Sequence, residues 1–403
     1  MTRVEPGETA ILDADPARDA LSSLSATAAA LWVPVVGVVA YMFMPLMIGG
    51  LAENLKLSPS ELGFVGAAEA GGMAVANLLA VLWIRKWDWR RATAGFILAM
   101  VAANLVSVIC NGFVSIALAR LIDGVAGGAL IAIGIAALSD NRRSELVFSL
   151  FIALEMIFSS IGFILLPPIQ TAMGVDGLFL AFAAVSATGL LVLPWLPRRG
   201  LDRSADAGVA GGLGSAGLTV SLVALTGAFL FFTSQGGLWA FIERIGAAAN
   251  LPGEAVSTAL AVSSLAGIAG ALGANQVLRI GLPGALLLVL AGEAASFWLL
   301  SEKLDADKYL IAASMFILWW SMVLPLMLVQ LNRLDPSGRL VILLYAVGKF
   351  GYMAGPAAMG LLVQGNYFGQ VIAVSAIVCA AGLVPLIVLA ALRGPRDRVG
   401  RTS

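Results

Sequence analysis

The chain has 403 residues, of which 60% are hydrophobic and 12% are charged, and its mean hydropathy is +0.95. These values lie outside the range of soluble globular proteins and predict a polytopic membrane protein. The formal net charge of +0 argues against a nucleic-acid partner, whose phosphates need a basic surface. There is no histidine, and Cys110 and Cys379 lie in separate apolar stretches, so we expect no metal site, no cofactor and no enzymatic centre.

The polar N-terminal segment, residues 1–30, is expected to be a cytoplasmic tail. Its first 24 residues hold five acidic side chains and lack the basic start and apolar run of a cleaved signal peptide. The first apolar segment is therefore expected to act as the targeting signal itself.

Twelve later segments each approach the length of about 20 apolar residues that a membrane-spanning helix needs. A polar, Gly-rich stretch at residues 197–216 is typical of a flexible linker and divides the twelve into two sets of six. We therefore predict an all-α membrane protein with two six-helix bundles, at residues 31–196 and 217–392, and a cytoplasmic tail at 393–403. The expected spans are 31–51, 61–84, 92–110, 113–138, 146–169, 177–196, 217–241, 255–278, 282–301, 309–331, 339–363 and 368–392.

The distribution of basic residues gives the orientation of these spans. Of the 24 Lys and Arg residues, eighteen fall in tails and loops on one side, four on the other side and two within spans. Because basic residues favour cytoplasmic loops, both termini are expected in the cytoplasm. The expected location is the plasma membrane, which is the inner membrane of a bacterium.

The stretch Ile116–Asp140 could cross a membrane but for two charges, Arg120 and Asp123. A charge at the centre of a span costs roughly 2.5–3.5 kcal/mol, so it normally faces a partner or a cavity. Asp123 can neutralise Arg120 from three residues away, while Gly124 and Gly128 let another helix approach. Two interpretations stay open, a substrate-binding or coupling role and a neutralised pair that serves folding alone.

Two further charges are expected at similar depth in the fifth and eleventh spans. Glu155 lies seven residues before Gly162, and Lys349 lies six before Gly355, so pseudo-symmetry would place them across one cavity. Lys349 is about ten residues into its span, too deep for its stem to reach either surface. We expect both charges to bind substrate or carry coupling, with a packing role for Lys349 as the alternative.

The remaining polar and aromatic candidates are more ambiguous. Glu69 has small neighbours, so a packing role and a coupling role are equally open, while Glu293 is expected to be a packing residue. Gln235, Tyr41, Trp239 and Trp319 are expected to line the site, with Trp320 as a further aromatic candidate, but Trp and Tyr also anchor helices at membrane interfaces.

Several of these motifs resemble those of the major facilitator superfamily. Arg120 followed by Gly124 and Gly128 is similar to the family's fourth-helix signature. GKFGYMAGPAAMG in the eleventh span, with Gly355 and Pro356, is similar to a Gly-Pro motif of the fifth helix in the family's antiporters, and we expect it to bend and pack the helix. The loop WIRKWDWRRATAG keeps a basic pair of the family's loop motif but lacks its leading Gly and Asp.

The resemblance implies a secondary transporter whose two bundles rock about a central site. No GxxxxGK[ST] loop is present, so an ion gradient is the expected energy source. Protons are the expected coupling ion, through Glu155, Glu69 or Asp123, with sodium as the alternative.

The expected substrate is a small organic carboxylate, aromatic ones included, taken up as a counter-charge to Arg120 and Lys349. The first alternative is a proton-coupled exporter of apolar or cationic compounds, since four acids within spans outnumber two bases. A non-transporting scaffold or channel is a more remote alternative. We expect a monomer whose partners are membrane lipid, the substrate and the coupling ion.

Overall fold

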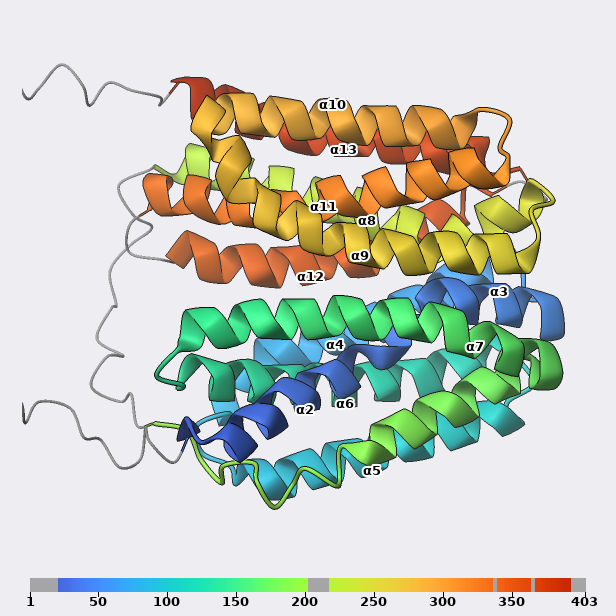
Figure 1. Ribbon diagram of the computed structural model, residues 1–403, viewed down its shortest axis with the longest axis vertical. Helices are drawn as coiled ribbons and strands as arrows, with labels where there is room; N and C mark the ends of the chain where they lie inside the picture. Colours follow the sequence, from blue (N-terminus) through green and yellow to red (C-terminus); the bar gives the residue numbers. More distant parts are fainter. Residues whose placement is uncertain (1–20, 202–216, 336–338, 364–366, 393–403) are drawn as a thin grey trace, which may run out of the picture.

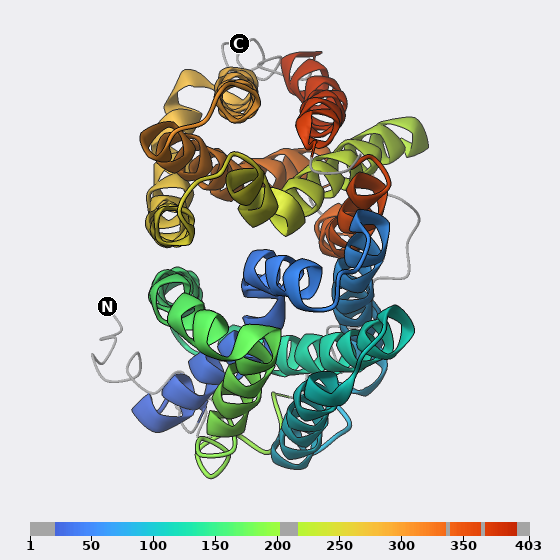
Figure 2. The ribbon, with the colours of Figure 1, turned by 90° about the vertical axis from the view of Figure 1, so that its right-hand side faces the viewer.

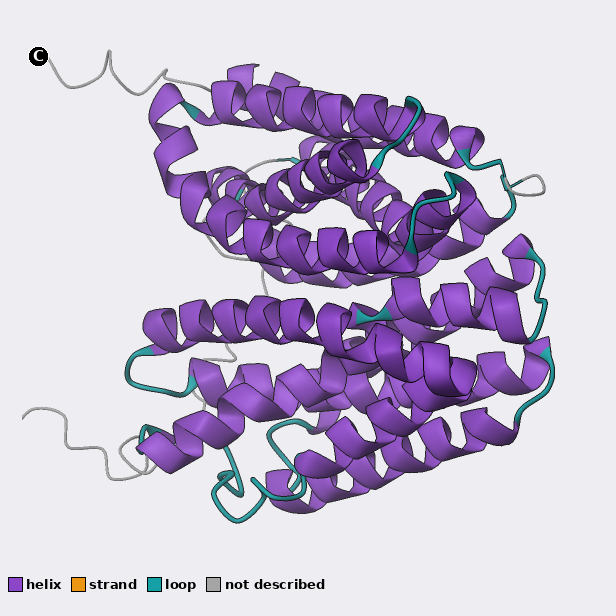
Figure 3. Ribbon diagram, turned by 45° about the vertical axis from the view of Figure 1, so that its right-hand side comes forward, coloured by secondary structure: helices purple, strands orange, loops and turns teal. Residues whose placement is uncertain are grey.

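The computed structural model describes residues 21–201, 217–335, 339–363 and 367–392. Within these ranges the chain is helical and contains no strand (Figure 3). Parts of the expected tails and linker lie outside the described residues. The helices are α2 (Leu24–Met42), α3 (Met44–Asn54), α4 (Pro59–Trp83), α5 (Trp89–Ile109), α6 (Phe113–Ser139), α7 (Ser144–Thr188), α8 (Leu218–Ala248), α9 (Gly253–Val277), the 3-10 turn η2 (Leu278–Ile280), α10 (Leu282–Ser301), α11 (Ala306–Leu334), α12 (Arg339–Gly360) and α13 (Gly369–Leu392).

The first expected span consists of two helices, α2 and α3, which meet at Phe43. Pro45 explains the break, because it has no N–H to bond the carbonyl of Tyr41 and its ring crowds the preceding turn. The span also begins earlier than expected. Ser23 caps α2, accepting a hydrogen bond from the Ala26 amide at 3.3 Å, so the helix starts seven residues before the predicted boundary at 31.

The fifth and sixth expected spans form one continuous element, α7, which has a non-helical residue at Gly174. The φ angle of Gly174 is +67°, a conformation that glycine adopts without strain, so the chain can turn there. The sixth span was expected to reach residue 196, but α7 ends at Thr188. The prediction was wrong here because the amides of Gly189, Leu190 and Leu191 bond carbonyls three residues back and not four, so residues 189–195 form turns.

Ten helices in the described ranges are long and apolar enough to cross a membrane. This number counts α2 with α3 once and α7 once, and it does not include α12. Dividing α7 at Gly174 and adding α12 would give the expected twelve spans. That count stays a prediction.

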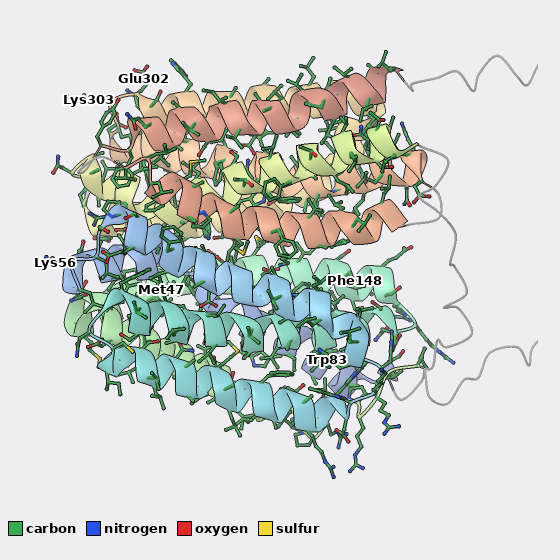
Figure 4. The ribbon with its side chains drawn as sticks, turned by 180° about the vertical axis from the view of Figure 1, so that it is seen from behind. Met47, Lys56, Trp83, Phe148, Glu302 and Lys303 are labelled. Atoms are coloured by element: carbon green, nitrogen blue, oxygen red, sulfur yellow. The ribbon has the colours of Figure 1, made fainter. Side chains whose placement is uncertain are left out.

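The helices form two groups that lie one above the other, α2 to α7 below and α8 to α13 above (Figures 1 and 2). We call one end of the molecule the arginine-rich end and the other the α3 end. Lys56 and Lys303 lie at the α3 end, while Trp83 and Phe148 lie toward the arginine-rich end (Figure 4). The loops and helix termini of the arginine-rich end hold Arg85, Lys86, Arg90, Arg91, Arg142, Arg143, Arg198, Arg199, Arg279 and Arg333.

The two groups pack on each other through α4 on α12, α3 on α8 and α7 on α9. Helices α4 and α12 approach each other closely, since a Cβ added at Gly360 would lie 2.6 Å from the Pro59 carbonyl oxygen and 3.0 Å from the Cα of Gly63. At Gly66, such an atom would lie 3.1 Å from the Cβ of Pro356. These contacts lie toward the α3 end, and the ribbons of the two groups separate toward the arginine-rich end (Figure 3).

A small polar cluster closes the arginine-rich end of the first group. Arg85 forms an ion pair with Asp140 at 2.7 Å, and the same carboxylate accepts a hydrogen bond from the Leu201 amide at 2.9 Å. The Arg85 guanidinium also donates to the Leu201 carbonyl at 3.2 Å. The chain is thus fastened to the first group up to residue 201, beyond the start of the expected linker.

Candidate functional site

A cavity of about 200 Å³ lies between the two groups of helices. Its walls come from α2 and α7 of the first group and from α8, α9, α11 and α12 of the second. Because both groups contribute, any movement of one group against the other changes its shape. The lining residues are Val38, Tyr41, Met42, Glu155, Met156, Ser159, Trp239, Ser264, Ile317, Trp320, Ser321, Lys349 and Tyr352.

Two opposite charges face this central cavity, Glu155 from α7 and Lys349 from α12. Their charges interact electrostatically, yet within the described part of the chain neither forms an ion pair within 4.0 Å or a hydrogen bond. An ion held away from water normally has a partner, because its desolvation is costly. The pair is therefore electrostatically incomplete, and a polar ligand could contact both charges.

Aromatic rings from both groups surround these charges. Tyr41 and Tyr352 lie edge to face with centroids 5.8 Å apart, and Trp239 and Trp320 do so at 6.0 Å. The Trp320 indole donates a hydrogen bond to the Tyr352 hydroxyl at 2.9 Å, which fixes both rings. Such faces and edges can hold a flat apolar body while the charges hold its polar end.

Prolines leave backbone carbonyls of three lining residues without their usual helical partner. Pro45, four residues after Tyr41, has no N–H, and the Tyr41 carbonyl instead accepts a hydrogen bond from the Trp239 indole at 3.4 Å. This bond joins α2 of the first group to α8 of the second. Tyr352 stands in the same relation to Pro356, as does Ser321 to Pro325.

Two serines connect the groups beside the cavity. The hydroxyls of Ser159 on α7 and Ser264 on α9 lie 3.0 Å apart, within hydrogen-bonding distance. The sequence interpretation did not include Ser159 or Tyr352, although helical spacing could have identified them. Ser159 is four residues after Glu155, and Tyr352 is three after Lys349, so each shares a helix face with its charge.

Arg120, Asp123 and Glu69 lie together, but within the first group of helices. The Arg120 guanidinium is fully buried, 3.8 Å from the Glu69 carboxylate and 3.7 Å from that of Asp123. It donates to the Ser107 hydroxyl at 2.8 Å and lies over the Phe179 ring. None of these residues lines the central cavity, so the expectation that Arg120 supplies it with a second cation is corrected.

Two acids for one base leave this buried cluster one negative charge in excess if both carboxyls are ionised. Asn104 donates to Asp123 at 2.6 Å, which favours an ionised Asp123. Among the described ion pairs, Arg120 is the one basic residue that contacts Glu69. A proton on one carboxyl would balance the cluster.

Two predicted lining residues are placed elsewhere by the structure. Gln235 is buried in the second group, where its amide lies 4.0 Å from the Cys379 sulfur. Trp319 packs against Gly292 of α10, and the next residue, Trp320, faces the cavity instead. Adjacent helix positions point about 100° apart, so the sequence could not decide which tryptophan turns inward.

The glycines and the proline of the expected packing motifs lie at close helix contacts. Gly124 lies against the Glu69 backbone, and a Cβ on Gly128 would come 2.6 Å from the Met73 carbonyl. Gly355 packs on α8, with 2.5 Å between an added Cβ and the Gly237 nitrogen, while Pro356 contacts α4. The expected bend at Pro356 stays a prediction.

A sequence profile of the Major Facilitator Superfamily matches residues 33–339. The chain belongs to this superfamily. The family and its solved relatives are transporters, so this protein is a multi-pass membrane transporter and not an enzyme. No curated protein matches the sequence significantly.

Solved structures of transporters share the fold at low sequence identity. A point mutant of the nucleoside transporter NupG has a TM-score of 0.70 and 12% identity, over 91% of this chain and 99% of its own. The human organic anion transporter MFSD10 (TETRAN) has a TM-score of 0.60 and 15% identity, over 91% and 99%. A bacterial homolog of the human lysosomal transporter Spinster, in an inward-facing, unoccupied conformation, has values of 0.57 and 15%, over 94% and 96%.

Proposed function

We propose that the protein is a proton-coupled secondary transporter that takes up a small organic carboxylate with an aromatic or other flat apolar body. It works by alternating access, with residues 31–196 and 217–392 as its two six-helix bundles and the bacterial inner membrane as its location. The main support is the central cavity, where Lys349 and Glu155 face each other from different groups without an ion pair among the described residues.

Lys349 is the reason for proposing a negatively charged substrate. An ammonium group open to a cavity between two moving bodies can bind a carboxylate from either side of the membrane. The rings of Tyr41, Trp239, Trp320 and Tyr352 surround it and suit a flat apolar body. When no substrate is bound, a movement of one group against the other could bring the Glu155 carboxylate, which lines the same cavity, to Lys349 as its counter-charge.

Protons are the proposed coupling ion because carboxyl groups within the membrane can alternate between protonated and ionised forms. The chain has no histidine, so these carboxyl groups would carry the proton. Glu155 is the first candidate, since it faces the site where the substrate charge arrives. The cluster of Glu69, Arg120 and Asp123 is the second candidate, since its excess carboxyl can hold a proton. Sodium is the alternative ion.

Export of an apolar or cationic compound is the second candidate function. It is favoured by Glu155, which could bind an organic cation, and by the apolar lining residues Val38, Met42 and Ile317. The two functions differ in which charge the substrate needs. Lys349 is essential for uptake of an anion, while Glu155 is essential for export of a cation.

The orientation is part of the proposal, with the arginine-rich end in the cytoplasm. Reporter fusions after residues 198 and 392 should both give a cytoplasmic signal. An external signal at either position would contradict the orientation and the count of twelve spans.

The decisive experiment has two stages. Purified protein is first screened by thermal shift against carboxylates, amino acids, sugars, nucleosides and cationic drugs, because a ligand that binds the folded state raises the melting temperature. Hits are then tested for counterflow in proteoliposomes, with and without an imposed pH gradient. The proposal is supported if a carboxylate shows counterflow and accumulates inside the proteoliposomes when the exterior is acidic. Binding of cations alone supports export. Absence of counterflow contradicts transport of the screened compounds.

A further inference from the structure

A second cavity, of about 640 Å³, lies between the two groups at the α3 end. We call it the α3-end cavity. Helices α3 and α7 of the first group and α8 and α9 of the second form its walls. Three carboxylate residues are among its lining, namely Glu53, Glu243 and Glu254, and no basic residue is.

Glu243 is the distinctive member of these three. Its carboxyl group lies against Gly49 of the opposite group, so closely that a Cβ added at Gly49 would be 2.7 Å from the Glu243 Cδ. The Oε2 atom is buried and has no hydrogen-bond partner in the described part of the chain. A bare glycine in α3 thus provides the space that this carboxyl of α8 occupies when the two groups are in contact.

The charged and titratable neighbours of Glu243 form bonds with other groups or are exposed to solvent. Arg244, the adjacent cation, forms its ion pair with Glu53 of α3 at 3.6 Å. On α11, the Tyr309 hydroxyl donates its hydrogen to the Ile242 carbonyl at 2.8 Å. On α9, Glu254 is exposed. Among the described residues Glu243 therefore forms no ion pair of its own while the groups are closed, and the charge of Arg244 acts on it only from beyond ion-pair distance.

The α3-end cavity adjoins the central cavity through one aromatic contact between the groups. Phe163 of α7 lines the α3-end cavity, and Trp239 of α8 lines the central one. Their rings meet edge to face with centroids 5.9 Å apart. Separation of the groups at Gly49 and Glu243 would also part these rings and connect the two cavities.

We propose that Glu243 is a proton-binding site that controls the gate at the α3 end. Glu243 is half-buried, but one of its carboxylate oxygens is buried without a partner, which is costly for the ionised form and tolerated for the neutral acid, so the closed arrangement favours binding of a proton. When the groups part, water reaches the carboxyl and it ionises. Closure thus takes up a proton and opening releases one, so low pH favours the closed gate and rising pH favours the open one. The proposal does not depend on the substrate or on Glu155.

The test measures the width of the gate directly. Spin labels are attached at Asp176→Cys on α7 and Lys303→Cys after α10, both exposed at the α3 end, in a background carrying Cys110→Ser and Cys379→Ala. Pulsed electron spin resonance gives the distance distribution in nanodiscs between pH 5 and pH 9. The longer-distance population should grow as pH rises in the parent protein, and Glu243→Gln should keep the short distance at every pH.

Three variants make the result specific. Glu254→Gln removes an exposed carboxylate of the same cavity, and it should leave the pH response unchanged. Glu155→Gln should also leave it unchanged, even where it abolishes proton-driven accumulation, which separates this proposal from the proposed coupling role. Gly49→Ala occupies the space of the carboxyl, and it should move the midpoint of opening to lower pH.

Either of two results would overturn the proposal. One is a distance distribution in the parent protein that does not change with pH. The other is a pH response in Glu243→Gln equal to that of the parent. Thermal unfolding of each variant checks that it is folded, and if Glu243→Gln does not fold, an unshifted midpoint in Gly49→Ala contradicts the proposal in its place.

Discussion

The two sets of membrane-embedded charges differ in where their partners come from. Arg120, Glu69 and Asp123 all belong to the first group of helices and hold one another at 3.7–3.8 Å in full burial. Glu155 and Lys349 belong to different groups and face an open cavity. Charges paired within one group keep the same partners when the groups move, while charges split between two groups change their environment.

This difference assigns the two sets different roles. The cluster around Arg120 should matter chiefly for folding and for holding a proton, and the Glu155–Lys349 pair chiefly for substrate and coupling. Four substitutions, taken from the largest expected effect to the smallest, test this assignment.

Arg120→Met should have the largest effect on stability. It leaves the Glu69 and Asp123 carboxyls buried without a cation, which costs about 3–5 kcal/mol in comparable buried pairs. Thermal and denaturant unfolding in detergent measure it. Arg244→Met is the matched control, because the Glu53 carboxylate that it leaves behind is 63% exposed and water can replace the lost bond. Equal losses in the two variants would contradict the assignment.

Lys349→Met should preserve folding but weaken binding of an anionic substrate by about 30-fold or more, roughly 2 kcal/mol. The substitution keeps the length and apolar stem and removes only the charge. Lys303→Met, at an exposed site of the α3 end, is the control and should bind normally. Unchanged affinity and transport rate in Lys349→Met would make the residue structural and remove the main support for an anionic substrate.

Gly124→Ala should destabilise the first group by about 1–3 kcal/mol, because its Cβ would meet the Glu69 backbone and force α4 and α6 apart. Gly95→Ala on α5 provides a contrast, since nothing lies within 4 Å of its added Cβ. There the better helix propensity of alanine should leave stability unchanged or raise it slightly. Unfolding curves that coincide for the two variants would show that the close approach at Gly124 imposes no constraint.

Glu155→Gln should abolish accumulation driven by a pH gradient while leaving counterflow intact. One proton per substrate at a gradient of one pH unit supports at most about tenfold accumulation, or 1.36 kcal/mol. The variant should bring this ratio to about one, as measured by uptake into proteoliposomes. A variant that still concentrates substrate would move the coupling site to Glu69 and Asp123.

The sequence predicted the features that depend on local composition. Apolar length indicated the helices, and the parallel spacing of Glu155 and Lys349 from later glycines predicted one shared cavity, which both residues line. Prediction failed where rotation or long-range packing decides, since no local signal distinguishes Trp319 from Trp320 or shows that Glu69 reaches Arg120 from another helix. Hydropathy does not register the Ser23 cap that starts α2 early, or the change to turns after Thr188 that ends α7 early.

The prolines that follow Tyr41, Ser321 and Tyr352 by four residues leave three carbonyls of lining residues without their helical donor, and that of Tyr41 accepts the Trp239 indole instead. An alanine scan of the cavity would leave these carbonyls in place and so would underestimate what the wall contributes. Their removal requires replacing Pro45, Pro325 or Pro356, none of which lines the cavity. Selection for altered substrate preference should therefore yield proline substitutions one helical turn away, as well as changes in the residues that touch the substrate.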